Sequence, residues 1–165
     1  MSSLKLIKLI LFSTLSTTAL AQSATPDLSL AQASHHWQVA LANQAYCQGL
    51  DAANYTPLFT VKRQQWEIAI KRQYLLNQSM LKFMTQNKAA PFANLIELST
   101  VKLSYSDAEL SQIRLPSGWQ ELESGRPLLS QIEQRFQTTD KDSKHAACLA
   151  ALQKTGLPSL LALPE

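Results

Sequence analysis

The chain has 165 residues, with 15 lysines and arginines against 12 aspartates and glutamates, for a formal charge of +3. This length suits one domain with a hydrophobic core and is too short for two. Only Lys62-Arg63 and Lys71-Arg72 are adjacent basic pairs, which argues against a nucleic-acid or acidic-membrane partner, because such partners need a concentrated basic patch. Four glycines are few for an all-β protein with many tight turns, so the composition favours helices.

The first 21 residues have the layout of a secretory signal peptide. Lys5 and Lys8 precede a short apolar stretch from Leu9 to about Leu15, and the small-residue site Ala19-Leu20-Ala21 follows it. The apolar stretch is too short to cross a bilayer, since a transmembrane helix needs about 20 apolar residues. We therefore predict cleavage after Ala21.

Cleavage at this point has two consequences. It leaves a helical domain of residues 22–165 in the periplasm, or secreted, without a stable membrane anchor. It also removes two lysines and lowers the formal charge from +3 to +1. Most of the apparent basicity therefore belongs to the predicted signal segment.

Two helices are predicted in the first half of the domain. Residues 29–48 form the first, because Ser29 and Gln32 have the spacing of a capping box and Gly49 can adopt a left-handed cap. The second is expected to start at Thr56-Pro57, since a proline at the first helical position needs no N–H donor. Its pattern continues to about residue 87.

A narrow polar stripe runs along the second predicted helix. Its members recur at intervals of 3, 4 and 7: Gln64, Glu67, Lys71, Gln78, Lys82 and Thr85. Because apolar residues occupy much of the remaining surface, we expect this helix to be buried on two or more sides and to be the central element. Glu67 and Lys71 are four residues apart and are predicted to form a surface ion pair.

Residues 91–105 are ambiguous, because their apolar spacing suits a helix at first and a strand later. We predict a helix to about Leu103, since a lone strand would have no partner in a helical chain. Ser106 and Glu109 have the spacing of another capping box and predict a short helix that ends before Pro116.

Two further helices are predicted before the end of the chain. Pro127 opens the first, and residues 138–142 interrupt it. Asp140 or Asp142 can cap the next, which is expected to stop at Gly156. The predicted fold is thus all-α: a single compact domain of five or six helices around one long central helix, closed by a disulfide.

The disulfide prediction rests on Cys47, near the end of the first helix, and Cys148, in the last. In an exported chain an even number of cysteines indicates a disulfide, which would join the first helix to the last. His36 and His145 allow an alternative metal or redox site with these cysteines. The chain lacks the CxxC and HxxxH motifs of such sites, so no metal and no cofactor is predicted.

Other chemically capable side chains have simpler interpretations. His35 and His36 point about 100° apart on a helix and do not readily face one ion. Glu121 and Glu123 would make a general acid and base only in differently tuned environments, and we expect them on a solvated loop. The tryptophans are expected in the core rather than around a ligand cleft: Trp37, Trp66 and Trp119.

No local catalytic motif is present, so no catalytic residue is predicted. We expect a small exported binding protein, such as an inhibitor, an immunity protein or an envelope accessory factor, whose partner is another envelope or periplasmic protein. One alternative is an enzyme whose site is assembled from His35, His36, His145 and the acidic loop near Glu121. The other is a small-ligand or lipid carrier, which requires a continuous apolar cavity.

Overall fold

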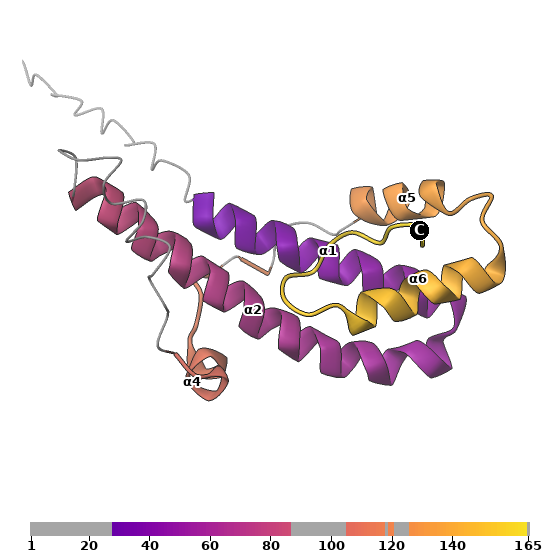
Figure 1. Ribbon diagram of the computed structural model, residues 1–165, viewed down its shortest axis with the longest axis horizontal. Coiled ribbons are helices and arrows are strands. Elements are labelled where there is room, and N and C mark those ends of the chain that lie inside the picture. Colours follow the sequence, from indigo (N-terminus) through magenta and orange to yellow (C-terminus); the bar gives the residue numbers. More distant parts are fainter. Residues whose placement is uncertain (1–27, 87–104, 118, 121–125, 165) are drawn as a thin grey trace, which may run out of the picture.

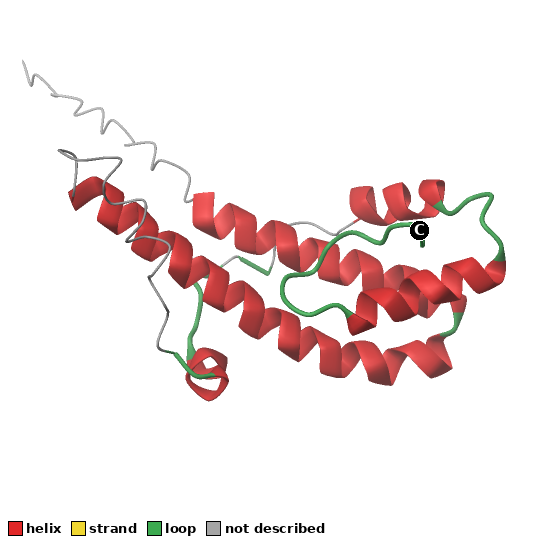
Figure 2. Ribbon diagram, in the orientation of Figure 1, coloured by secondary structure: helices red, strands yellow, loops and turns green. Residues whose placement is uncertain are grey.

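The computed structural model describes residues 28–86, 105–117, 119–120 and 126–164. Within these ranges the chain forms helices and no strand (Figure 2), as the composition predicted. The helices are α1 (Leu28–Leu50), α2 (Ala52–Gln86), α4 (Asp107–Gln112), α5 (Arg126–Arg135) and α6 (Lys141–Gln153). The predicted signal peptide, the ambiguous stretch 91–103 and the carboxylates of Glu121 and Glu123 lie outside the described residues.

Helices α1 and α2 form a long antiparallel hairpin (Figure 1). Asp51 alone joins them. Its carboxylate accepts a hydrogen bond of 3.2 Å from the backbone N–H of Asn54, so Asp51 acts as the N-cap of α2. The predicted start at Thr56 is therefore wrong, because the capping side chain lies five residues earlier.

Pro57 consequently lies inside α2 instead of at its first position. Proline has no N–H, so the carbonyl of Ala53 lacks its usual donor four residues on. Both Ala53 and Pro57 are exposed, which allows water to hydrate that carbonyl. The helix therefore tolerates a residue that would break a buried one.

Two clusters of buried side chains form the core. The larger lies at the α1–α2 junction, where α5, α6 and the C-terminal segment 154–164 cover the hairpin; Phe59, Trp66, Ile132, Phe136 and Leu161 are among its members. The smaller lies farther along the hairpin and contains Ala33, Trp37, Ile70, Leu115 and Trp119. All three tryptophans are buried, in agreement with the expectation that they belong to the core.

The polar stripe of α2 is less exposed to solvent than predicted. Glu67 and Lys71 do form an ion pair, with 2.8 Å between Oε1 and Nζ. Lys71 is only 5% exposed, however, and its ammonium also donates to the carbonyl of Ser111 at 3.1 Å. The end of α4 and the segment after it cover this lysine, so the pair is not a surface one.

The C-terminal end of α2 is more exposed to solvent than predicted. Met80, Leu81 and Met84 were placed on the apolar part of the helix, and all three are exposed. Burial on several sides therefore holds for the half of α2 near the hairpin junction, where Phe59, Trp66 and Ile70 are buried.

Local capping signals decide the other helix ends. The Ser106–Glu109 capping box of α4 and the Asp140 cap of α6 are both present, as predicted. Ser29 lies within α1, and Gly49 also belongs to that helix, so the predicted caps at those positions are wrong. Gly156 has a φ of 86°, two residues beyond the C-cap of α6, and it turns the chain into the C-terminal segment.

Candidate binding groove

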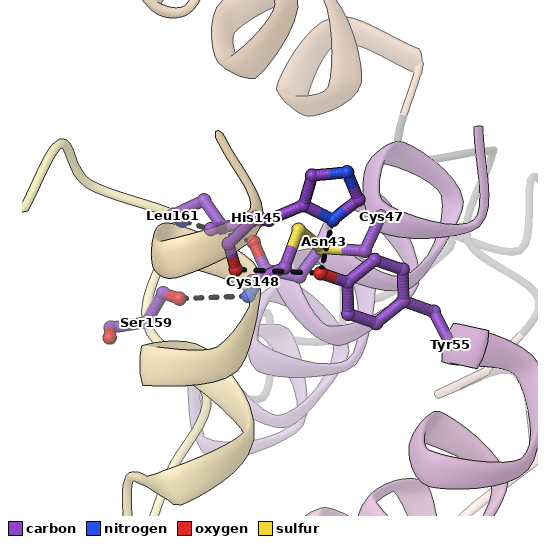
Figure 3. The surroundings of a disulfide bond; sticks show 7 residues. All are labelled: Asn43, Cys47, Tyr55, His145, Cys148, Ser159 and Leu161. Atoms are coloured by element: carbon purple, nitrogen blue, oxygen red, sulfur yellow. Dashed lines mark hydrogen bonds between the residues drawn. A yellow bond between two sulfur atoms is a disulfide. The ribbon is translucent and has the colours of Figure 1, made fainter. Parts of the chain in front are cut away.

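The predicted disulfide is present and joins α1 to α6 (Figure 3). The Cα atoms of Cys47 and Cys148 are 5.9 Å apart, and neither residue is exposed to solvent. Thiol–disulfide exchange needs access of a thiolate to one of the sulfurs. This bond is therefore a structural one, and the redox alternative loses its support.

His145 lies beside the disulfide and contacts Tyr55 from α2 (Figure 3). The Tyr55 hydroxyl is 2.7 Å from His145 Nδ1, and the two rings are stacked with centroids 5.7 Å apart. Burial, with a smaller contribution from Asp51, raises the pKa of Tyr55, so the hydroxyl keeps its proton at neutral pH. The pair joins α6 to α2 in the same region as the disulfide.

The other two histidines lie elsewhere on the hairpin. His35 and His36 have ring centroids 6.0 Å apart. His36 precedes Cys47 by 11 residues, or about 16 Å along the helix axis, whereas His145 is one turn from Cys148. The hydrogen-bonding partner of His145 is Tyr55 and not another histidine.

The histidines thus give little support to an enzyme site assembled from them, and Glu121, its fourth member, lies outside the described residues. In the described part of the chain, no three His, Cys, Asp or Glu side chains are grouped so that they could hold a metal ion.

A more distinctive feature is an apolar groove of about 320 Å³ between α2 and α6, hereafter the α2–α6 groove. Its lining comprises Leu58, Val61, Lys62, Gln65, Leu149, Leu152 and Gln153. The α2 members recur at the three- and four-residue spacing of one helical face, and so do those of α6. The two helices therefore present aligned apolar faces on either side of the groove.

The aliphatic side chains of this groove are unusually accessible. Leu58 and Leu149 are each 47% exposed, and Val61 is 58% exposed. Single exposed apolar residues are ordinary on a protein surface, but a contiguous set in a concavity marks a binding surface. The groove is also bounded only by residues that the structure describes.

The two stretches that line the α2–α6 groove carry basic residues, and acidic residues lie just before them at Asp51 and Asp142. Residues 52–66 and 143–154 contain no acidic residue. Lys62 lines the groove and is 7% exposed, with its ammonium donating to the carbonyl of Lys154 and lying 5.9 Å from the Trp66 ring. Burial lowers the pKa of Lys62, and among the described residues no carboxylate pairs with it.

Lys154 follows Gln153 in the chain but lines a separate pocket, together with Trp66 and Ser159. Its Nζ atom lies 3.4 Å from the Ser159 hydroxyl, and it too lacks a carboxylate partner within the described part. Arg63 points elsewhere, since its guanidinium stacks over Trp37 at 4.8 Å. Among the described residues Lys62 is therefore the cation that lines the groove, and it is largely buried.

The pattern of residues did not predict this groove. Leu58 and Val61 belong to the start of the second predicted helix and Leu149 to the last predicted helix, and no binding role was predicted for any of them. The spacing Leu58, Val61, Gln65 was a usable signal for an aligned face. The exposure of that face could not be predicted from the spacing, because it depends on which helix packs beside it.

Comparison with known proteins gives no match to this chain among protein-family models, curated proteins or solved structures. Within the described residues, none of the helices has the length and apolarity needed to span a membrane.

Proposed function

We propose that this protein is a small exported binding protein that engages another protein of the cell envelope through the α2–α6 groove, as an inhibitor, an immunity protein or an accessory factor. The observation that carries the proposal is the set of Leu58, Val61 and Leu149, which are about half exposed in one concavity. Completely burying such a side chain contributes about 1.5–3 kcal/mol. Roughly half of that remains available to a partner at each position.

Two further observations support this assignment. The fully buried disulfide is compatible with an oxidising compartment outside the cytoplasm. The described histidines also take part in packing and hydrogen bonding instead of converging on one reactive centre. A binding role needs only the surface that the groove provides.

Site-specific photocrosslinking tests the proposal. We would place p-benzoylphenylalanine at Val61 and Leu149, on the two walls of the groove, and at Gln131, an exposed residue of α5. The expected result is one protein adduct of defined mass from both groove positions in the native envelope, and none from position 131. Equal adducts from all three positions, or no protein adduct from the groove, would count against this function. Lipid adducts at the groove positions would favour a carrier instead.

A further inference from the structure

We infer that the C-terminal segment 154–164 and α6 form a second binding site, which takes the extended C-terminal residues of another protein through main-chain hydrogen bonds. The inference does not rest on the function proposed above, because this site and the α2–α6 groove share no lining residue. Two features of the segment carry it. One is a set of backbone groups without partners, and the other is the slot beside them.

The segment uses the backbone groups of one edge for contacts within the protein. In an extended chain the N–H and C=O groups of one residue point to one edge, and those of the next residue point to the opposite edge. The Ser159 carbonyl and the Leu161 N–H both face the Asn43 carboxamide. Leu160 and Ala162 therefore direct their backbone groups to the other edge, where no described residue forms a hydrogen bond with them.

A slot of about 260 Å³ lies between this segment and α6, alongside which the segment runs back (Figure 1). Residues 157–164 line the slot without interruption, so the main chain borders it as well as the side chains. The opposite wall consists of Ala147, Ala150 and Ala151 of α6, together with Trp66. The small alanine side chains leave room for a few residues of a second extended chain.

The free backbone groups select the class of ligand. N–H and C=O groups that alternate along an edge are complementary to the main chain of another extended peptide, which is the basis of strand addition. A lipid chain in the slot would cut these groups off from water without replacing their hydrogen bonds, which is unfavourable. A helix offers no free backbone groups along its length. An extended peptide is therefore the ligand that fits this edge.

Lys154 sets the direction of the peptide. It lines the slot where the extended segment begins, with its Nζ atom 3.4 Å from the Ser159 hydroxyl. The described lining of the slot contains no acidic residue. A C-terminal carboxylate at this end would accept hydrogen bonds from the ammonium and the hydroxyl. The bound peptide would then run antiparallel to the segment, with its earlier residues toward Pro164.

Fluorescence anisotropy with short peptides tests this inference on the whole exported chain. The probes are three labelled hexapeptides of alternating threonine and valine, which end in valine, leucine or phenylalanine with a free carboxylate. We expect saturable binding of at least one probe, with a Kd below about 1 mM. Replacing its carboxylate by an amide is expected to weaken binding about two- to fivefold, because an exposed charge pair contributes modestly.

Methylation of alternate amide nitrogens of the best probe tests the main-chain pairing. The methyl groups remove the N–H donors of one peptide edge and block its approach to the segment. Methylation of the edge that faces the segment is expected to weaken binding about tenfold or more, whereas the same number of methyl groups on the other edge should change the affinity less than about twofold.

Matched variants of the protein locate the binding. Ala150 is exposed and lines the slot, so Ala150→Leu should fill the slot without disturbing the core and weaken binding about tenfold or more. Ala146→Leu is the control, because Ala146 is also exposed on α6 but lies outside the lining. Lys154→Gln should weaken binding about two- to fivefold, and Lys141→Gln should leave it unchanged.

Three outcomes would overturn the inference. These are no saturable binding of any probe, equal effects of the two methylation patterns, and equal affinities of Ala150→Leu and Ala146→Leu. Binding that survives both methylation patterns but is lost on amidation would indicate a site for small carboxylates and would also refute it. The crosslinks expected from Val61 and Leu149 do not depend on this slot, so a failure here leaves the proposed function standing.

Discussion

Asn43 accepts a hydrogen bond of 3.0 Å from the backbone N–H of Leu161, 118 residues later in the chain. The same carboxamide donates to the carbonyl of Ser159 at 2.8 Å (Figure 3), and the Arg135 guanidinium donates to the carbonyl of Leu161. These side chains take the place of a neighbouring strand for an extended segment that makes no helix. The C-terminal segment is thereby held against α1 and α5.

We predict that Asn43→Ala destabilises the protein by about 2–4 kcal/mol, because the buried backbone N–H of Leu161 and the part-buried carbonyl of Ser159 both lose their partner. Chemical denaturation followed by circular dichroism measures this loss. Asn54→Ala is the control, since its side-chain hydrogen bond with Asp51 is exposed, and it should cost about 0.5 kcal/mol or less. Similar losses in the two variants would show that Asn43 does not hold the segment.

Reduction of the disulfide, or Cys148→Ser, is expected to lower the melting temperature markedly while leaving the helical signal in place. The bond closes a loop with a sequence separation of 101 residues, to which the chain-entropy model assigns about 4.7 kcal/mol. Thermal unfolding with and without reductant, followed by circular dichroism, measures the effect. Two free thiols in the protein purified without reductant would contradict the native disulfide.

The pH dependence of stability near neutrality is predicted to come from His36. Burial lowers the pKa of this imidazole from its usual value of 6.5, outweighing the opposite effect of a hydrogen bond with the Pro158 backbone. The unfolded state therefore binds more protons than the folded state between the lowered pKa and 6.5. Stability is complete above pH 6.5 and falls as the pH decreases through that window.

Unfolding free energies between pH 5 and 7.5 test this prediction. His36→Gln should flatten the profile, whereas His35→Gln should retain most of it, because His35 is the smallest contributor to the shift. Hydrogen bonds lower the pKa values of Asp51, Glu109 and Asp140. Their stabilisation is lost only below the ordinary pKa of a carboxyl group, outside this range. An unchanged slope in His36→Gln would refute the assignment.

Asp140→Ala is expected to cost about 1 kcal/mol, since the Asp140 carboxylate accepts hydrogen bonds from the backbone N–H and the hydroxyl of Ser143 at the start of α6. Asp142→Ala is the natural comparison, because Asp142 lies in the first turn and is not the N-cap. Its loss should be smaller, about 0.3–1 kcal/mol from the helix dipole alone. Denaturation curves of the two variants measure both losses of unfolding free energy. A larger loss in Asp142→Ala than in Asp140→Ala would contradict this order.

Leu58→Gln and Leu149→Gln are predicted to lower the free energy of unfolding by about 1 kcal/mol or less each, because both leucines are half exposed and glutamine has a similar helix propensity. By contrast, Leu161→Ala should cost about 2–5 kcal/mol, since Leu161 is buried. Denaturant titrations compare the three variants. A large loss in either groove variant would mean that the α2–α6 groove serves stability and not binding.

Much of the architecture was predictable because it depends on residue counts and on hydrogen bonds between residues close in the sequence. A low glycine content and clear capping patterns favour helices. The caps at Ser106 and Asp140 need only hydrogen bonds within the first turn of their own helices. The disulfide between Cys47 and Cys148 followed from two cysteines in a chain with a predicted export signal. The caps do not depend on how distant segments pack, and the disulfide needed no packing argument because two cysteines allow only one intramolecular pairing.

The tertiary structure decided everything that depends on distant neighbours. Asp51 caps α2 instead of Thr56, because the turn of the hairpin lies at Asp51. Lys71 is buried because the end of α4 and the segment after it cover it. The same holds for the groove. Leu58 and Leu149 resemble core residues in the sequence, but they remain exposed, because a helical face is buried only where another element of the chain packs against it.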